Sequence, residues 1–162
     1  MMSRVTRLAQ AMTIAGAGLA GLAPLAASAE MAASVDRPVT ITFYTYNLAT
    51  AGAGQTEGTR QLIREFMEAN PQVTVDPVPV TSPEMTARVQ ADVAAGRVPD
   101  VAQIVFDGLD FASHNLGAQA LEDIAPAGEM AAHFAGMAPN GVKLGVVDGK
   151  TYGLAYTFST PV

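Results

Sequence analysis

The sequence predicts an α/β fold in which helices cover a mainly parallel β-sheet. Between residues 39 and 106, segments with two-residue alternation and segments with helical periodicity follow one another in the order β-α-β-α-β. The last of these segments, residues 101–106, is a short apolar run of the kind that forms buried parallel strands. Strands that alternate with helices pair in parallel, because each helix returns the chain to the edge where the previous strand began.

The first strand is expected over residues 39–46, where β-branched and aromatic residues alternate at period two. A Gly-rich and almost uncharged loop follows over residues 47–58. The first helix is expected over residues 59–69, and Asn70-Pro71 stops it. One face of this helix is predicted to be apolar and to consist of Leu62, Ile63, Phe66 and Met67.

The second strand is expected over residues 73–80. Pro77 and Pro79 lack the N–H that a neighbouring strand would need, so this strand is predicted to lie at an edge of the sheet. A second helix follows, with Thr81 or Ser82 as its N-cap. The buried stripe of this helix and the residue that ends it are predicted at Met85, Val89, Val93 and Gly96.

After residue 106 the periodic segments become shorter and more helical. Residues 143–147 and 151–158 flank residues 148–150 (Asp-Gly-Lys), and Asp-Gly between two such segments is a strong signal for a β-hairpin. Three short helices are predicted before this hairpin, over residues 107–115, 121–124 and 128–134.

The N-terminus is interpreted as a cleavable secretory signal peptide, residues 1–29. Arg4 and Arg7 precede an apolar, Ala- and Gly-rich stretch that ends in the small residues 27–29 (Ala-Ser-Ala). A retained membrane helix would need about 20 strongly apolar residues in a row, and this stretch is interrupted by glycines and polar residues. The working protein is therefore expected to start near Glu30 and to act outside the cytoplasm, in the periplasm.

The composition of the exported part restricts its partners. The first 29 residues contain two of the nine basic residues and none of the 15 acidic ones, so the remainder carries a formal charge of −8. A negative surface argues against nucleic acids and anionic membranes as partners. The chain contains no Cys, so its stability cannot depend on disulfides and must come from a hydrophobic core.

Three places where a ligand could bind follow from the predicted sheet, because ligands of open α/β sheets bind beyond the carboxyl ends of the strands. After the first strand come Tyr44 and Asn47, and a flexible surface loop is an equally good interpretation of this segment. After the third strand comes Asp107, which is at least as readily a helix N-cap. The third place is residues 156–161, where Tyr156 and several hydroxyls follow closely; a plain edge strand is the alternative.

An exported hydrolase or a metal-binding protein is the alternative class of function. Asp107, Asp110 and His114 would share one face of a helix and resemble half of a metal site. The other histidine, His133, and the absence of Cys leave that set incomplete, so a solvated polar helix face is the better interpretation. The sequence has no Gly-x-Ser-x-Gly elbow and no evident carboxylate pair, so we expect neither an enzyme nor a bound cofactor.

Several motifs in order resemble a known family. After the signal peptide and the strand at 39–46 come FMEANP at 66–71, GRVPDV at 96–101 and GKTYGL at 149–154. Together they resemble the N-terminal part of extracellular solute-binding proteins of the sugar-type ABC importers. The ending FSTPV, at 158–162, is most similar to the periplasmic glycerol-3-phosphate-binding members.

The resemblance implies a periplasmic-binding-protein fold, in which two α/β lobes joined by a hinge close on a solute. Residues 30–38 would be a leader, and residues 39–162 the N-terminal lobe, truncated at or near the crossover to the second lobe. The implied protein is a monomer that captures a small sugar, polyol or glycerol-phosphate ester and delivers it to a membrane permease. Which solute it binds is not implied.

The resemblance also implies ligand-binding residues. A serine of the Ser-Thr-Pro-Val motif contacts ligand in the glycerol-3-phosphate binders, and this position is Ser159. An acidic residue after the third strand does so too, and Asp107 matches it with a spacing that differs by one residue. Those proteins use a tyrosine in the loop after the second strand, where this chain has Thr-Ser-Pro-Glu at 81–84. Ser82 of that loop completes the candidate set with Tyr44, Asn47 and Tyr156.

Overall fold

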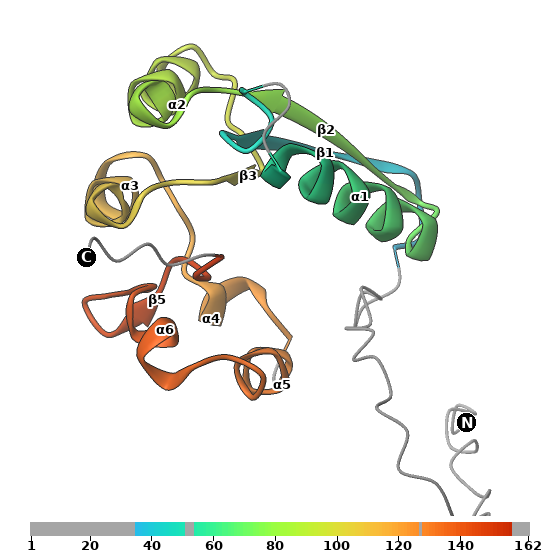
Figure 1. Cartoon of the computed structure of the whole chain (residues 1–162). Coiled ribbons are helices and arrows are strands. Elements are labelled where there is room, and N and C mark those ends of the chain that lie inside the picture. The colour runs from blue at the N-terminus through green and yellow to red at the C-terminus, as the bar shows by residue number, and fades with distance from the viewer. Residues whose placement is uncertain (1–34, 51–53, 127, 157–162) are drawn as a thin grey trace, which may run out of the picture.

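A computed structural model describes residues 35–50, 54–126 and 128–156 (Figure 1). Three strands form a parallel sheet in the order β2-β1-β3, with β1 spanning Val39–Thr45, β2 Val73–Pro79 and β3 Val101–Ala102. The helices α1, Gly54–Ala69, and α2, Met85–Ala94, connect these strands. The predicted β-α-β-α-β order and parallel sheet are therefore confirmed. The signal peptide predicted for residues 1–29 lies outside the described residues.

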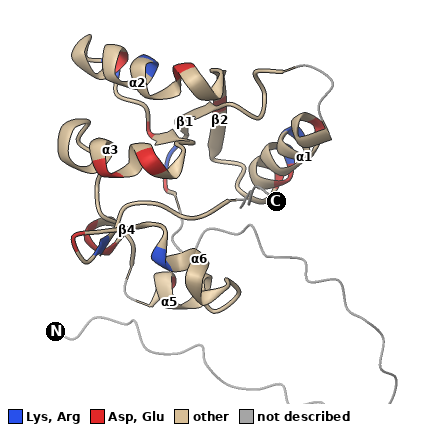
Figure 2. Cartoon of the chain, turned by 60° about the vertical axis from the view of Figure 1, so that its left-hand side comes forward, with Lys and Arg blue, Asp and Glu red and all other residues tan. Residues whose placement is uncertain are grey.

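The two faces of the sheet are covered by different helices. In Figures 1 and 2, α1 lies on one side of β1 and β2, and α2 lies on the other side with α3, Leu109–Asn115. This follows from alternation along a strand, since neighbouring side chains of β1 point to opposite faces. On the side of α2 and α3, the buried cluster consists of Tyr44, Val80, Met85, Val89, Ala112 and Leu116.

The outer edge of β2 offers few donors to another strand. The N–H of Val73 donates to the carbonyl oxygen of Asn70 over 2.8 Å, and the N–H of Val75 donates to Sδ of Met67 over 3.3 Å. Pro77 and Pro79 follow at the same two-residue spacing and have no N–H. The predicted edge position of this strand is confirmed, and the proline pattern reduces the tendency of such an edge to recruit other chains.

Two details of the first helix differ from the prediction. It begins at Gly54 rather than near residue 59, because its first turns are held by buried Thr56 and Thr59. Leu62, expected on the buried face, is 54% exposed. The buried stripe instead continues from the two threonines to Ile63 and Met67, at the spacing of one helical face.

The third strand is shorter and more exposed than expected. Its pairing with β1 covers only Val101 and Ala102, and Val101 is 49% exposed. A 3-10 turn, η2 (Phe106–Gly108), then leads into α3. The N-cap of η2 is Val105 and that of α3 is Gly108, so Asp107 caps neither. Both the buried strand over 101–106 and the N-cap role of Asp107 were wrong, because the chain leaves the sheet early and curves toward α2.

The remaining elements form a smaller layer below the sheet. The helices α4, Leu121–Ile124, and α5, Glu129–Phe134, occur where they were predicted, whereas α6, Pro139–Lys143, was not expected. The strands β4, Val146–Val147, and β5, Lys150–Thr151, form the predicted hairpin but are shorter than expected. Their turn has positive φ at Asp148 (49°) and Gly149 (80°), as a two-residue type I′ turn requires.

A buried carboxylate ties α2 to the centre of the sheet. Asp92 is 1% exposed and accepts hydrogen bonds from the hydroxyl of Tyr44 over 2.8 Å and from the guanidinium groups of Arg88 and Arg97. These donors favour the ionised form, so the pKa of Asp92 lies well below its usual range. A group whose pKa is lowered by folding stabilises the native state above its unfolded pKa of about 4, and this contribution is lost as the pH falls.

We expect Asp92→Asn to lower the melting temperature of the protein by at least about 5 °C at neutral pH, because two guanidinium groups lose their buried counter-charge. Asp123→Asn is the matched control, since Asp123 makes an exposed ion pair with Lys150 that contributes little. Thermal unfolding measured between pH 3 and 7 should show the difference between Asp92→Asn and the unchanged protein shrinking below about pH 4. Equal melting temperatures for the two variants would contradict the role of Asp92.

Candidate functional site

The parallel sheet brings three loops to one edge. The carboxyl ends of β1, β2 and β3 are joined there by backbone hydrogen bonds from Val80 to Thr45 (3.1 Å) and from Gln103 to Tyr44 (2.8 Å). The segments that contain Asn47, Ser82 and Asp107 follow these ends. The three strands thus supply the arrangement that was predicted for a ligand site.

The loops after β2 and β3 approach each other closely. A Cβ added to Gly108 would lie 2.9 Å from Cγ2 of Ile104 and 3.3 Å from Oγ1 of Thr86, which lies in the first turn of α2. Ser82 begins a 3-10 turn, η1 (Ser82–Glu84), that leads directly into α2. The structure therefore places the segment of Ser82 and that of Asp107 side by side. Asp107 is exposed, and Ser82 is half-buried.

Tyr44 lies behind the edge of the sheet rather than at its surface. The residue is 6% exposed, and its hydroxyl donates to Asp92. The pKa of Tyr44 is raised, mainly by this hydrogen bond to a carboxylate and secondly by the burial of the side chain. The guanidinium of Arg88 lies 6.0 Å from the centre of the Tyr44 ring. The structure thus shows Tyr44 supporting the core between β1 and α2.

Asn47 is also buried, at 6% exposure, and three threonines contact it. Its backbone N–H donates to Oγ1 of Thr45 over 3.2 Å, and its side-chain Nδ2 donates to Oγ1 of Thr59 over 3.1 Å. Its carbonyl oxygen accepts from Oγ1 of Thr56 over 2.9 Å. We call Thr45, Thr56 and Thr59 the threonine cluster.

The threonine cluster was not anticipated from the sequence. A signal for it exists, because Thr56 and Thr59 extend the buried stripe of α1 toward its N-terminus at helical spacing. The predicted helix starts at Thr59, so Thr56 was assigned to the preceding loop and Thr59 was not included in the predicted apolar face. Asp92 was missed for a different reason: an acidic residue near the end of a helix is normally solvated, and its partners lie as far away as Tyr44.

The third predicted place is described only in part. Tyr156 is 54% exposed, whereas Ser159 lies outside the described residues. A Cβ added to Gly153, three residues before Tyr156, would lie 3.3 Å from Cδ1 of Leu109, two residues after Asp107. The chain at Gly153 therefore packs against the start of α3.

The hairpin that precedes this segment is held to its neighbours by an ion pair and by a hydrogen bond. Lys150 binds Asp123 of α4, with Nζ 2.9 Å from Oδ2. Nδ1 of His114 lies 2.9 Å from the carbonyl oxygen of Asp110, and Nε2 lies 3.0 Å from Oδ2 of Asp148. Both partners are acceptors, and they raise the pKa of His114.

Among the described residues, no group of three or more His, Cys, Asp or Glu side chains could hold a metal ion.

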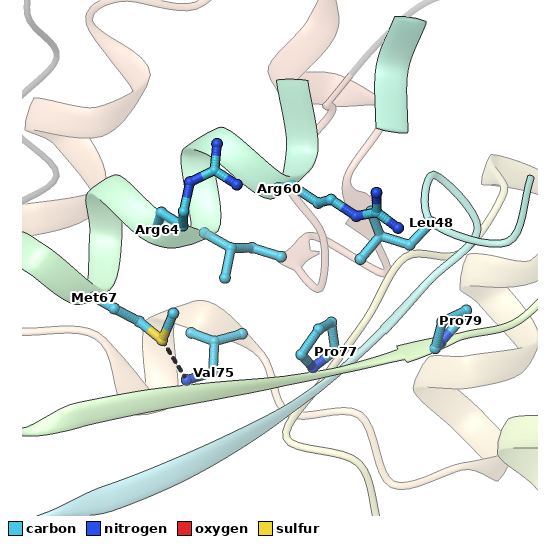
Figure 3. Close-up of a pocket in the computed structure, with 8 residues that line it drawn as sticks. Leu48, Arg60, Arg64, Met67, Val75, Pro77 and Pro79 are labelled. Carbon is cyan, nitrogen blue, oxygen red and sulfur yellow. Dashed lines mark hydrogen bonds between the residues drawn. The ribbon is translucent and has the colours of Figure 1, made fainter. Parts of the chain in front are cut away.

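A shallow hollow of about 330 Å³ lies away from these loops, between α1 and β2 (Figure 3). None of the described candidate ligand residues lines it. Met67 points from α1 toward β2, where its sulfur accepts the hydrogen bond from Val75. Most of the lining is apolar, with two arginines from α1, and it consists of Leu48, Arg60, Ile63, Arg64, Met67, Val75, Pro77 and Pro79.

The sequence of residues 61–162 matches the family model of bacterial extracellular solute-binding proteins. The matched region contains β2, α2 and β3 and the loops with Ser82 and Asp107. The chain belongs to this family. No curated protein matches the chain.

Solved structures of solute-binding proteins share the fold. The galacto-N-biose/lacto-N-biose I-binding protein of an ABC transporter from Bifidobacterium longum, in complex with lacto-N-biose, has a TM-score of 0.58 at 21% identity, over 75% of this chain and 29% of its own. An extracellular solute-binding protein of family 1 from Alicyclobacillus acidocaldarius gives 0.55 at 21%, over 75% and 28%. The GacH receptor of Streptomyces glaucescens, solved unliganded and with acarbose, gives 0.54 at 22%, over 71% and 28%.

These comparisons establish a partial solute-binding-protein fold with a parallel sheet in its N-terminal lobe. The chain spans less than a third of the length of the solved proteins that it matches. Among the described helices, none is both long and apolar enough to cross a membrane.

The close approach of the loop after β3 to α2 can be tested at Gly108. We expect Gly108→Ala to destabilise the protein by about 1–3 kcal/mol, because the added methyl group must displace Ile104 and Thr86. The backbone itself is not strained there, since φ is −87°. Gly58→Ala is the control: nothing lies within 4 Å of its Cβ, and alanine in a helix should stabilise by about 0.5–1 kcal/mol. Urea unfolding that ranks the two variants in the opposite order would refute the contact.

Proposed function

We propose that the full-length protein binds a small carbohydrate in the periplasm and delivers it to the permease of an ABC importer. The observation that carries the proposal is the family match over residues 61–162, because it includes two of the three loops at the carboxyl edge of the sheet. Export by a signal peptide at residues 1–29 agrees with the extracellular character of the family.

The proposed protein has two lobes, and residues 39–162 form its N-terminal one. Solved relatives are more than three times as long as the part they share with this chain, which leaves room for a second lobe. A two-lobed protein binds by closing around its solute, and the solute stabilises the closed state over the open one. Such a function needs no catalytic group, so we propose a monomeric binding protein rather than an enzyme.

A neutral sugar suits the chemistry of this lobe better than a phosphate ester. Two relatives were solved with lacto-N-biose and with acarbose, which are carbohydrates. Arg88 and Arg97, the basic residues in and after α2, both bind the carboxylate of Asp92, so each guanidinium group already has an anionic partner. Glycerol 3-phosphate, implied by the FSTPV ending, is the alternative solute.

Individual roles follow from exposure. Asp107 is exposed at the carboxyl edge, where its carboxylate would accept hydrogen bonds from sugar hydroxyls. Tyr156 would offer an aromatic face to a sugar ring, and Ser82 and Ser159 would offer hydroxyls. Tyr44 and Asn47 are buried, so we propose that they shape the site from behind rather than touch the solute.

We expect the full-length protein to bind at least one member of a panel containing lacto-N-biose, maltotetraose, acarbose and glycerol 3-phosphate. Isothermal titration calorimetry would measure the affinity, and chromatography of the incubated solutes would detect turnover. Binding of glycerol 3-phosphate alone would reassign the solute class. Hydrolysis of any glycoside, or no binding across the panel, would contradict a carbohydrate-binding receptor.

In the same assay we expect Asp107→Asn to weaken binding of the preferred panel member about tenfold or more, since a hydrogen bond to a charged acceptor is lost. Asp110→Asn removes another exposed charge about one helical turn away and should change the affinity by less than about twofold. Both variants should keep the melting temperature of the unchanged protein without solute. Equal affinities for the two variants would place the solute elsewhere.

A further inference from the structure

The loop after β1 is anchored by buried hydroxyl groups at several points. Thr45 and Thr56 are 0% exposed, and Thr59 is 5% exposed, yet all three face polar atoms rather than the apolar core. We propose that this threonine cluster holds the loop of residues 46–50 in the shape that binds solute, and that Asn47 and Thr56 are positioning residues of the site. This inference rests on the proposed function.

The three hydroxyls contact one residue, Asn47, at its backbone N–H, its carbonyl oxygen and its side-chain amide. Together these contacts fix both the path of the main chain and the rotamer of the side chain. Hydrogen bonds that only satisfied buried hydroxyl groups could go to any nearby acceptor or donor. Here all three go to the same loop residue.

Thr56 also binds the far end of the loop. Its hydroxyl lies 2.9 Å from the carbonyl oxygen of Asn47 and 2.8 Å from that of Thr50. Both carbonyl groups are therefore turned toward α1, and a turn hydrogen bond from Ala49 to Tyr46 (3.1 Å) closes the segment between them. A single side chain thus gathers the two ends of a short loop.

Burying a hydroxyl group costs free energy unless the group has a hydrogen-bond partner. A buried hydroxyl group without a hydrogen-bond partner lowers the stability of the folded protein. Valine has a similar shape and would pack at the same position without this desolvation penalty. Threonine at two successive positions of the buried stripe of α1 is explained if its hydroxyl groups serve as hydrogen-bond partners for the loop. By contrast, the same stripe is apolar at Ile63 and Met67, where it faces β2 rather than the loop.

The cluster also links two of the three ligand loops. The hydroxyl of Thr45 donates to Oε1 of Gln103 over 2.8 Å while it accepts the N–H of Asn47. Gln103 follows β3 and precedes Asp107 by four residues. A change in the conformation of the loop after β1 would therefore also shift the start of the loop after β3.

The test compares Thr56→Val, which removes the donor at nearly constant shape, with Thr56→Ser, which keeps it, in the full-length protein. Without solute, hydrogen exchange at the amides of Asn47 and Ala49 should be about five- to tenfold faster in Thr56→Val and restored within about twofold in Thr56→Ser. The affinity for the best-bound of lacto-N-biose, maltotetraose and acarbose should fall by a similar factor in Thr56→Val only.

Thr42→Val is the matched control. The hydroxyl of Thr42 donates to Oδ2 of Asp100 over 2.7 Å, nearer the amino end of β1, so its loss should lower stability without changing exchange at Asn47 or the affinity. Thr59→Val, which removes the acceptor for Nδ2 of Asn47, replaces Thr56→Val if the latter does not fold.

Unchanged exchange at Asn47 and Ala49 in the valine variants would overturn the inference, as would an equal loss of affinity in Thr42→Val. The exchange measurement needs no sugar. A protein that binds no member of the panel but shows the expected exchange would therefore refute the proposed function and not the anchoring of the loop.

Discussion

The structure depends on the position of β1 between two parallel neighbours. Pairing with β2 runs along the whole strand, from Val39 opposite Val73 to Thr45 opposite Pro79, and pairing with β3 occurs at Phe43 and Tyr44. Because all three strands run in one direction, every loop that follows a strand must emerge at the same edge. Residues that are far apart in the sequence, such as Asn47, Ser82 and Asp107, thereby share one region of the molecule.

The two faces of β1 are joined to their helices by different chemistry. Toward α2, a charge-assisted network centred on Asp92 accompanies an apolar cluster, and its partners are Tyr44, Arg88 and Arg97. Toward α1, neutral hydroxyl groups of the threonine cluster replace the apolar contacts near the carboxyl end of the strand. The links between α2 and the sheet are therefore charge-assisted, whereas those between α1 and the end of β1 are neutral hydrogen bonds, which are individually weaker.

Several features were predictable because they depend on neighbouring residues alone. Prolines at alternate positions of β2 indicated an edge strand, because proline has no backbone N–H to donate to a neighbouring strand. Asp148-Gly149 indicated a type I′ turn, because these residue types readily adopt the positive φ that this turn needs. Errors arose where the outcome depended on distant partners. Leu62 has the residue type of a buried face, but it is exposed, and Ile63 lies on the side of the helix that faces the sheet. The segment that contains β3 has the composition of a buried strand, but it pairs at only two positions. The predicted ligand residue Asp107 proved exposed, while Tyr44 and Asn47 proved buried.

The sequence by itself determined the α/β class, the order of the elements and the family resemblance, because periodicity, turn residues and short motifs are local properties of the chain. Only the tertiary structure decided which polar side chains are buried and what they bind. Asn47 reaches Thr59 across 12 positions, and Tyr44 reaches Asp92 across 48. Such pairs form only after the sheet has brought its loops and helices together. Helical spacing could indicate that Thr56 and Thr59 are buried, but it could not indicate which residues they bind.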